Sequence, residues 1–219
     1  MRRALVALLV VACATGPRVV PDFAAYSRLA REDPAQRLVD LETFIPGIVL
    51  DIRYATPNNF MHQTLYPVAK AWLRYPAAVA LREIQQELAR EGLGLKIYDG
   101  YRPYSITKRM WDAIRNPDFV ADPAKGSRHN RGAAVDLTLI DLRTGSELPM
   151  PTPYDDFTPR AAQDFNDLPA EQIANRAKLR DVMTRHGFEP LPTEWWHFDF
   201  AGWQKFDLLN VDLRELRSE

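Results

Sequence analysis

Three side chains in the sequence have the type and the setting of metal ligands. His129 lies in the polar segment GSRHNRG, and Asp136 follows within the apolar run AAVDLTLI. A carboxylate in an apolar run is costly to remove from water unless a positive charge meets it. His197 stands between Trp196 and Phe198 in EWWHFDF, where its ring is held firmly and has few other partners. We expect His129, Asp136 and His197 to bind one Zn²⁺ ion per chain.

This ligand set is typical of a catalytic zinc site. Two histidines and one carboxylate, each about 2.0–2.2 Å from the ion, leave a fourth position open for water. Since Co²⁺ and Mn²⁺ also occupy mixed nitrogen and oxygen sites, the ligand types do not fix the metal. Cys13 is the only cysteine, so a site built from several thiolates and an intrachain disulfide are both excluded.

Two further residues are suited to hydrolysis at such a site. Glu194 precedes His197 by three positions, a spacing that puts the two on opposite faces of a regular strand. Glu194 must therefore lie in the turn before the strand or across a bulge, where it can take a proton from the metal-bound water and pass it to a leaving amine. Arg102 follows the turn residue Gly100, and Pro103 biases it toward an extended backbone. We expect its side chain to stabilise the oxyanion formed from a peptide carbonyl.

Each residue taken singly also has an ordinary structural explanation. His129 fits a solvated loop, Asp136 could cap a backbone or pair with an arginine, and Arg102 could form a surface ion pair. It is the occurrence of all these residues in one chain that favours a hydrolytic metal site.

The elements expected to position these residues are helices that alternate with short strands. Pro76 opens a segment with apolar residues at helical spacing, and Gly92 ends it. Helices are predicted over residues 76–91, 103–116 and 170–186, strands over residues 93–99, 130–140 and 194–200, and a proline-rich loop over residues 147–160. Because the regular βαβ alternation of a doubly wound sheet is missing, we expect an α+β fold. It would be a single compact domain with a small antiparallel or mixed sheet packed against helices.

The first residues predict export. Two arginines precede an apolar stretch that is too short to span a bilayer, and VVAC, which ends at Cys13, resembles a bacterial lipobox. We expect residues 1–13 to be a lipoprotein signal and Cys13 to carry a lipid anchor to the membrane. The protein would then be periplasmic or bound to the cell envelope. Ordinary cleavage near residues 12–14 and an uncleaved anchor are the alternatives.

The rest of the chain divides into two parts. Residues 14–40 mix prolines with charged residues, and we expect a tether or N-terminal extension with a short helix near residues 23–29 and little core. Residues 41–219 would form the domain. The chain has 28 basic and 29 acidic residues, so it lacks the excess of positive charge that polyanion binding requires. We expect no nucleic-acid partner.

Three motifs in this order resemble one known family. The segments DGYRP, SRHNRGAAVDLTL and EWWHF, with VLDIRYATPNNF upstream, are similar to the D-alanyl-D-alanine dipeptidases, VanX-like zinc peptidases associated with vancomycin resistance and D-Ala-D-Ala salvage. The resemblance covers about residues 40–203. It implies a zinc-peptidase domain and the metal, proton-transfer and oxyanion roles given above. It also implies that Ser127 lies beside the substrate and that Asp155 receives the substrate's ammonium group, with Asp156 as the alternative.

The charges of a free dipeptide lead to the same kind of residues. Its positive end requires an acid, for which Asp155 or Asp156 is available, and its negative end requires polar or basic groups, for which Ser127 and Arg131 are available. Small substrate size would be imposed by Trp195, Trp196 and the loop that closes the site.

The expected function is zinc-dependent hydrolysis of D-alanyl-D-alanine to two D-alanines, linked to cell-wall peptide turnover or glycopeptide resistance. The alternative is a D,D-carboxypeptidase or peptidoglycan endopeptidase that uses the same zinc site on longer peptides. A roofed site with an acid for the amine favours the dipeptidase, and an open groove favours the alternative. A lipid-anchored binding module without catalysis is a third hypothesis, against which Glu194 and Arg102 argue. The segment NNFMHQTLYP and the export signal depart from the family's resistance enzymes.

Overall fold

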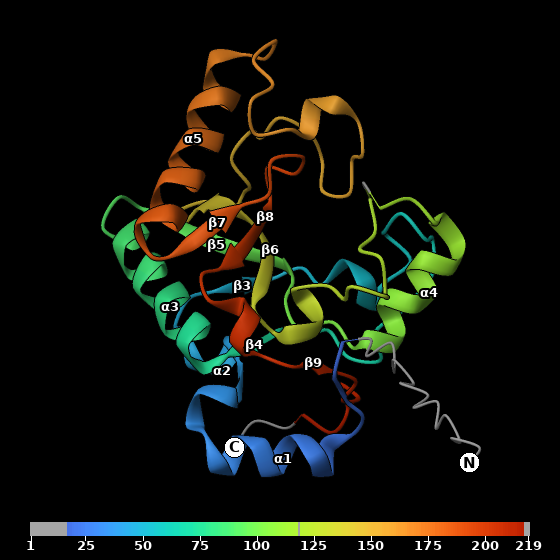
Figure 1. Cartoon of the computed structure of the whole chain (residues 1–219). Coiled ribbons are helices and arrows are strands. Elements are labelled where there is room, and N and C mark those ends of the chain that lie inside the picture. Colours follow the sequence, from blue (N-terminus) through green and yellow to red (C-terminus); the bar gives the residue numbers. More distant parts are fainter. Residues whose placement is uncertain (1–16, 118, 217–219) are drawn as a thin grey trace, which may run out of the picture.

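The structure is a computed structural model that describes residues 17–117 and 119–216 (Figure 1). The export signal expected over residues 1–13, and with it Cys13, lies outside the described residues. Within the described ranges, no helix is both long and apolar enough to span a bilayer.

A mixed five-stranded sheet forms the centre of the fold. Its strands lie in the order β3-β5-β6-β8-β7, with β3 parallel to β5 and the other neighbouring pairs antiparallel. The strands are β3 (Val49–Leu50), β5 (Leu93–Asp99), β6 (Ala134–Asp141), β7 (Phe188–Pro190) and β8 (His197–Phe200). Two smaller sheets pair β1 (Val19–Val20) with β9 (Leu208–Leu209) and β2 (Leu38–Asp40) with β4 (Trp72–Arg74). The predicted α+β class is confirmed.

Helices surround this sheet (Figure 1). The helices are α1 (Phe23–Glu32), α2 (Leu41–Phe44), α3 (Tyr75–Ala89), α4 (Tyr104–Ile114) and α5 (Ala170–Arg185). Short 3₁₀ turns are η1 (Pro34–Gln36), η2 (Arg53–Ala55), η3 (His129–Arg131), η4 (Pro159–Ala161) and η5 (Trp203–Lys205). In Figure 1, α3 and α5 lie on one side of the strands and α4 on the other. The three longest predicted helices are confirmed.

The register of β6 brings distant polar residues together. The strand lies between β5 and β8 and is buried along most of its length. Asp136 lies opposite Asp99 of β5 and opposite His197 of β8. Because directly opposed residues of neighbouring strands have Cβ atoms about 4.5–5.5 Å apart, the sheet itself places two of the predicted metal ligands side by side.

The strand predicted from residue 130 begins later. His129–Arg131 form the 3₁₀ turn η3, and Gly132, with a φ of +66°, ends that turn in the left-handed conformation. Glycine adopts this conformation without the steric penalty of a side chain. The chain changes direction here, so β6 begins at Ala134 and His129 lies in a turn beside the strand.

Residues 17–40 contribute to the core. Val20 of β1 pairs with Leu209 of β9, and both are buried. Tyr26 of α1 is buried, and its hydroxyl accepts a hydrogen bond from the N–H of Leu38 at 2.7 Å. The expectation that residues 14–40 add little core is therefore wrong for the described part. The physical reason is that α1 and the strands β1 and β2 each bury apolar side chains against the rest of the domain.

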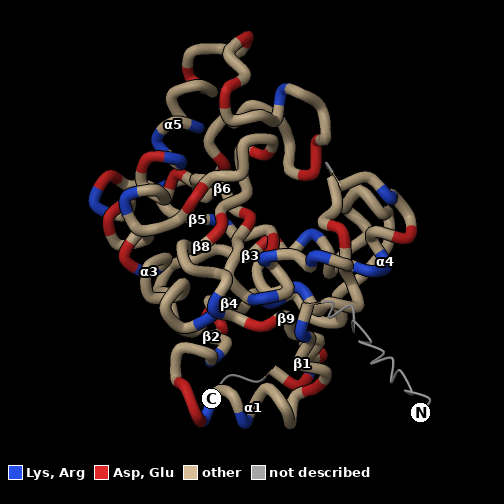
Figure 2. Tube along the Cα trace, viewed as in Figure 1, with Lys and Arg blue, Asp and Glu red and all other residues tan. Residues whose placement is uncertain are grey.

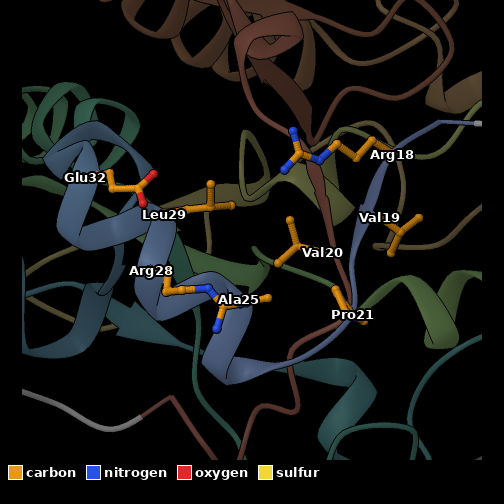
Figure 3. A pocket seen from close by; sticks show the side chains of 8 residues that line it. All are labelled: Arg18, Val19, Val20, Pro21, Ala25, Arg28, Leu29 and Glu32. Carbon is orange, nitrogen blue, oxygen red and sulfur yellow. The ribbon is translucent and has the colours of Figure 1, made fainter.

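A hollow of about 250 Å³ lies between β1 and α1 (Figure 3). Its lining is mostly apolar, with two arginines and a glutamate, and comprises Arg18, Val19, Val20, Pro21, Ala25, Arg28, Leu29 and Glu32. None of these residues is a candidate for the chemistry predicted above.

Acidic and basic residues are interspersed along most of the chain (Figure 2). The segment between β6 and α5 differs, because its acidic residues outnumber its two arginines, Arg143 and Arg160. The acidic residues are Glu147, Asp155, Asp156, Asp164 and Asp167. This local excess of negative charge favours the approach of a cation.

Gly132→Ala is expected to destabilise the protein more than Gly145→Ala. Both glycines have positive φ values, +66° and +73°, so both variants carry the left-handed penalty of about 1–2 kcal/mol. A Cβ at Gly132 would lie 2.6 Å from Cδ2 of Leu38, whereas a Cβ at Gly145 meets nothing within 4 Å. Overpacking should lower the free energy of unfolding by a further ~1–3 kcal/mol at Gly132. Urea titration of both variants measures the difference, and equal losses would contradict this account.

Candidate active site

His129, Asp136 and His197 meet at one point. Nε2 of His129 lies 3.1 Å from Nδ1 of His197. Nδ1 of His197 in turn lies 3.0 Å from Oδ1 of Asp136. Nε2 of His129 is 3.4 Å from the same carboxylate oxygen. All three side chains are buried. Across residues 17–117 and 119–216, they are the group of histidine and acidic side chains found close enough together to hold a metal ion.

Each imidazole is fixed through its outer nitrogen. Nδ1 of His129 donates to the carbonyl of Gly100 at 2.8 Å, and Nε2 of His197 donates to Oδ1 of Asp199 at 2.9 Å. Because a carbonyl and a carboxylate can only accept, the outer nitrogens carry protons. The inner nitrogens then present lone pairs to a metal ion when its binding displaces the proton that Nδ1 of His197 shares with Asp136. Three acceptor atoms therefore converge, an arrangement that a cation stabilises.

The spacing of the three atoms is close to that of zinc ligands and slightly shorter. Ligand atoms about 2.0–2.2 Å from a tetrahedral zinc ion lie roughly 3.3–3.6 Å from one another. The three observed separations are 3.0, 3.1 and 3.4 Å. Three protein ligands also leave one tetrahedral position for water or substrate, as catalytic zinc sites require.

The charges of the cluster also favour a bound cation. Burial opposes ionisation of Asp136, but His129 and His197 hold the pKa of this carboxyl well below its usual range. Burial likewise opposes protonation of His197, but hydrogen bonds with Asp136 and Asp199 raise the pKa of its imidazole well above the ordinary value. The two carboxylates therefore draw a positive charge, whether a proton or a metal ion, to this position.

Glu194 lies in the turn between β7 and β8, as its spacing from His197 required. Its N–H donates to the carbonyl of Leu191, which closes the turn. Oε2 of Glu194 lies 3.9 Å from Nδ1 of His197, the nitrogen that faces the metal position. Burial raises the pKa of Glu194 to about 7, although the nearby His197 opposes the shift. A carboxyl group with a pKa near neutrality can both accept and return a proton.

Arg102 extends from the end of β5 toward the cluster. Its Nε and Nη2 donate to Oδ2 of Asp99 at 2.9 and 2.7 Å. Nη2 also lies 4.0 Å from Oδ2 of Asp136, and the guanidinium carbon lies 5.1 Å from the ring centroid of Tyr54. These contacts fix the guanidinium beside the metal donors through two of its nitrogens.

Two tyrosines connect Asp136 to Asp155. The hydroxyl of Tyr154 lies 3.0 Å from Oδ2 of Asp136 and 3.2 Å from the hydroxyl of Tyr54. Tyr54 in turn donates to Oδ1 of Asp155 at 3.1 Å. The other oxygen of Asp155, Oδ2, is buried and has no hydrogen-bond partner among the described residues. The backbone of Asp155 is left-handed, with a φ of +61°, and strain of this kind is often retained where a side chain must be aimed.

The other predicted substrate residues divide into near and distant ones. Ser127 is buried next to His129, whose N–H donates to the Ser127 hydroxyl at 3.2 Å. Oδ1 of Asp156 accepts the backbone N–H two residues further on, at 2.8 Å. Arg131 donates to the carbonyl of Phe206, and its guanidinium lies over the ring of Trp203. The structure thus brings Ser127 to the cluster and engages Asp156 and Arg131 elsewhere.

Trp195 and Trp196 pack against the segment that carries Tyr154 and Asp155. Both are almost completely buried. Nε1 of Trp195 donates to Oγ1 of Thr152 at 2.9 Å, and the ring of Trp196 meets that of Tyr154 edge to face, with centroids 5.5 Å apart. These tryptophans support the segment that carries Tyr154 and Asp155, so any limit they set on substrate size acts through that segment.

Sequence reasoning missed four residues of the site, one of which is Tyr54, the link between Tyr154 and Asp155. Asp199 follows His197 by two positions on one strand, so the two-residue period of a strand could have identified it as a neighbour on the same face. Asp99, which holds Arg102, precedes it by three residues. Tyr154 stands next to Asp155, but no local pattern marks its role.

A buried set of two imidazoles and one carboxylate, with an acid and an arginine beside it, defines the class of zinc-dependent hydrolases. The family model described as D-ala-D-ala dipeptidase matches residues 34–211. The chain therefore belongs to the D-Ala-D-Ala dipeptidase family and is a zinc metallopeptidase.

Two relatives illustrate the similarity. The D-alanyl-D-alanine dipeptidase of Escherichia coli (strain K12) is 34% identical over 172 residues, which cover 78% of this chain and 89% of the relative. The D-alanyl-D-alanine dipeptidase of Enterococcus faecium is 32% identical over 180 residues, which cover 72% of this chain and 88% of the relative.

Solved structures give more distant matches. VanYB in complex with D-alanine-D-alanine has a TM-score of 0.42 and 15% identity, and the match covers 64% of this chain and 77% of that chain. The LD-carboxypeptidase LdcB has a TM-score of 0.41 and 24% identity, with 61% of each chain covered. Likeness at this level does not bear on function.

Asp199→Asn is expected to weaken zinc binding. The variant keeps an acceptor for Nε2 of His197 but removes the negative charge, and loss of such a partner typically lowers metal affinity ~10–100-fold. Competition with a chromophoric chelator measures the zinc affinity directly. Asp207→Asn, which removes a partly exposed carboxylate paired with Arg18, is the matched control and should bind zinc as wild type does. Equal affinity in all three proteins would contradict the assignment.

Proposed function

We propose that the protein hydrolyses the dipeptide D-alanyl-D-alanine to two molecules of D-alanine. The observation that carries this proposal is the buried Oδ2 of Asp155, which has no partner among the described residues and belongs to a carboxylate linked through Tyr54 and Tyr154 to Asp136. A free dipeptide has an ammonium group close to its scissile bond, and that group would satisfy this oxygen. The names of the two relatives support the same substrate.

In this proposal His129, Asp136 and His197 hold the zinc ion. When bound, the ion supplies Lewis acidity, which polarises a carbonyl group and lowers the pKa of water. Glu194 accepts the proton of the attacking water at Oε2 and delivers it to the amine nitrogen that leaves. Its raised pKa, about 7, suits both transfers because the group is near the midpoint of its titration at neutral pH.

Arg102 would stabilise the negative charge that develops on the carbonyl oxygen of the scissile bond. Its fork is held by Asp99 before the substrate arrives. A donor fixed in advance needs little reorganisation during the reaction, and the loss of one such donor typically slows catalysis ~10²–10³-fold.

Asp155 would recognise the amino end of the substrate. Burial, and secondarily the nearby Asp136, raises the pKa of Asp155 to about 8. The carboxyl group is therefore poorly stabilised as an anion until a cation approaches it. The ammonium group of the dipeptide supplies that cation and forms a charge-assisted hydrogen bond with Oδ2.

Ser127 is the candidate for the carboxylate end. Its oxygen accepts the N–H of His129, which leaves the hydroxyl proton available to a substrate carboxylate. The hydroxyl is held close to the metal donors, where the second residue of a short substrate would lie.

The substrate and metal requirement are tested with a panel of peptides. Zinc-loaded protein should release D-alanine from D-Ala-D-Ala, but not alanine from L-Ala-L-Ala, nor D-alanine from an acylated tripeptide that ends in D-Ala-D-Ala. Chelation should abolish the release, and added zinc should restore it. Chromatography of free alanine is the measurement, and preferential cleavage of the acylated tripeptide would instead favour a D,D-carboxypeptidase.

Glu194→Gln is the variant that isolates proton transfer in this assay. The amide keeps the size of the side chain but cannot accept the proton, so kcat should fall ~10²–10⁴-fold while zinc binding persists. A variant that binds zinc and cleaves as fast as wild type would remove Glu194 from the proposed mechanism.

We further propose that the chain is exported and carries a lipid on Cys13. The lipobox-like VVAC supports this location, where the enzyme would meet D-Ala-D-Ala released during cell-wall turnover. Cells that express the full chain should incorporate labelled palmitate into the protein and retain it in the membrane fraction. Cys13→Ser should lose both properties, whereas an unlabelled wild-type protein would contradict the anchor.

A further inference from the structure

Three segments far apart in the chain meet through phenylalanine rings. Phe60 follows η2, Phe119 follows α4, and Phe157 lies between β6 and α5. The rings of Phe60 and Phe157 meet edge to face with centroids 5.3 Å apart, and those of Phe119 and Phe157 stack at 4.7 Å. Phe157 therefore bridges the other two rings. We call these three residues the aromatic cap.

The aromatic cap is joined to the carboxylate proposed to receive the ammonium group. Asp155 precedes Phe157 by two residues. The ring of Tyr54 meets the ring of Phe60 edge to face at 6.1 Å, and the hydroxyl of Tyr54 donates to Oδ1 of Asp155. Asp155, Tyr54 and the aromatic cap thus form a continuous set of contacts around one end of the site.

Burial changes sharply across this set. Phe119 is 37% exposed, whereas Tyr54 is 2% exposed, and Oδ2 of Asp155 is enclosed. The aromatic cap therefore lies between water and the polar groups beneath it. Its rings come from three connecting segments, so side-chain contacts between segments keep the cap closed.

We propose that the aromatic cap limits the substrate at its amino end. The proposal rests on the dipeptidase function above and assigns the length limit to specific side chains. A free dipeptide ends at the ammonium group beside Asp155. A longer or acylated peptide continues beyond that point. The ring of Tyr54, whose hydroxyl binds Asp155, and the aromatic cap that packs on this ring lie at this end of the site. Such a peptide can be accommodated only when the rings separate.

Charge offers a competing explanation for the same selectivity. An acylated amine has no positive charge for Asp155, so the carboxylate alone could reject it. The two explanations differ in what relieves the rejection. Removing the ring of Phe157 opens space and leaves the acidic group of Asp155, whereas Asp155→Asn removes the acidic group and leaves the bulk.

The test compares D-Ala-D-Ala with N-acetyl-D-Ala-D-Ala, which is cleaved only if the acetyl group is accommodated beyond the amino end. Zinc-loaded wild type, Phe157→Ala and Asp155→Asn are assayed for kcat/KM on both substrates. We expect Phe157→Ala to raise kcat/KM for the acetylated dipeptide ~10-fold or more. Asp155→Asn should not raise it, and should lose activity on the free dipeptide. Phe157→Tyr, which keeps the ring, should retain the wild-type selectivity.

Two further variants complete the design. Phe119→Ala removes a more exposed ring of the aromatic cap and should give a smaller gain in the same direction, which keeps the test open if Phe157→Ala does not fold. Phe23→Ala is the matched control, because Phe23 on α1 is also 37% exposed and contacts one ring, that of Tyr26. It should change neither substrate.

The outcomes separate the two proposals. A gain on the acetylated dipeptide in Asp155→Asn alone, or in none of the variants, overturns the role of the aromatic cap while cleavage of D-Ala-D-Ala by wild type stands. A wild-type protein that cleaves the acetylated dipeptide as well as the free one also overturns it. Absence of D-Ala-D-Ala cleavage by wild type contradicts the proposed function itself.

Discussion

The buried carboxylate of Asp136 is the constraint that organises the site. It lies on the central strand of the sheet, almost fully removed from water, where an uncompensated charge is strongly destabilising. Its two carboxylate oxygens contact different side chains. Oδ1 faces the imidazoles of His129 and His197, and Oδ2 faces Tyr154 and Arg102. The metal donors and the groups proposed to handle the substrate are therefore arranged around one charge.

Much of this arrangement could be predicted because its signals are local in the sequence. The position of Asp136 in an apolar run indicates that a positively charged partner is buried with it. The odd spacing of Glu194 from His197 predicts that Glu194 lies in a turn. The apolar residues at helical spacing predict α3 for the same reason: the pattern repeats within a few residues. The order of the three motifs identified the family.

Other features could not be predicted because they depend on contacts between distant segments. Tyr54 and Asp155 are hydrogen-bonded although they are 101 residues apart in the sequence. No sequence pattern near either residue identifies the other as its partner. The contribution of residues 17–40 to the core depends on pairing with β9 near the other end of the chain. Arg131 was expected near the substrate, but the 3₁₀ turn that aims His129 at the cluster directs Arg131 toward Phe206.

The separation of the metal ligands along the sequence affects how metal binding is coupled to folding and how long the protein survives. His129 and His197 are 68 residues apart, and the triangle of donors closes only when β8 has paired with β6. An ion that binds the finished fold and not the unfolded chain stabilises it, by about 4 kcal/mol at a free concentration a thousand times its Kd. Scarcity of zinc would therefore do more than silence the enzyme. It would enlarge the unfolded population and expose the chain to proteolysis, so the supply of metal would govern the lifetime of the protein as well as its activity.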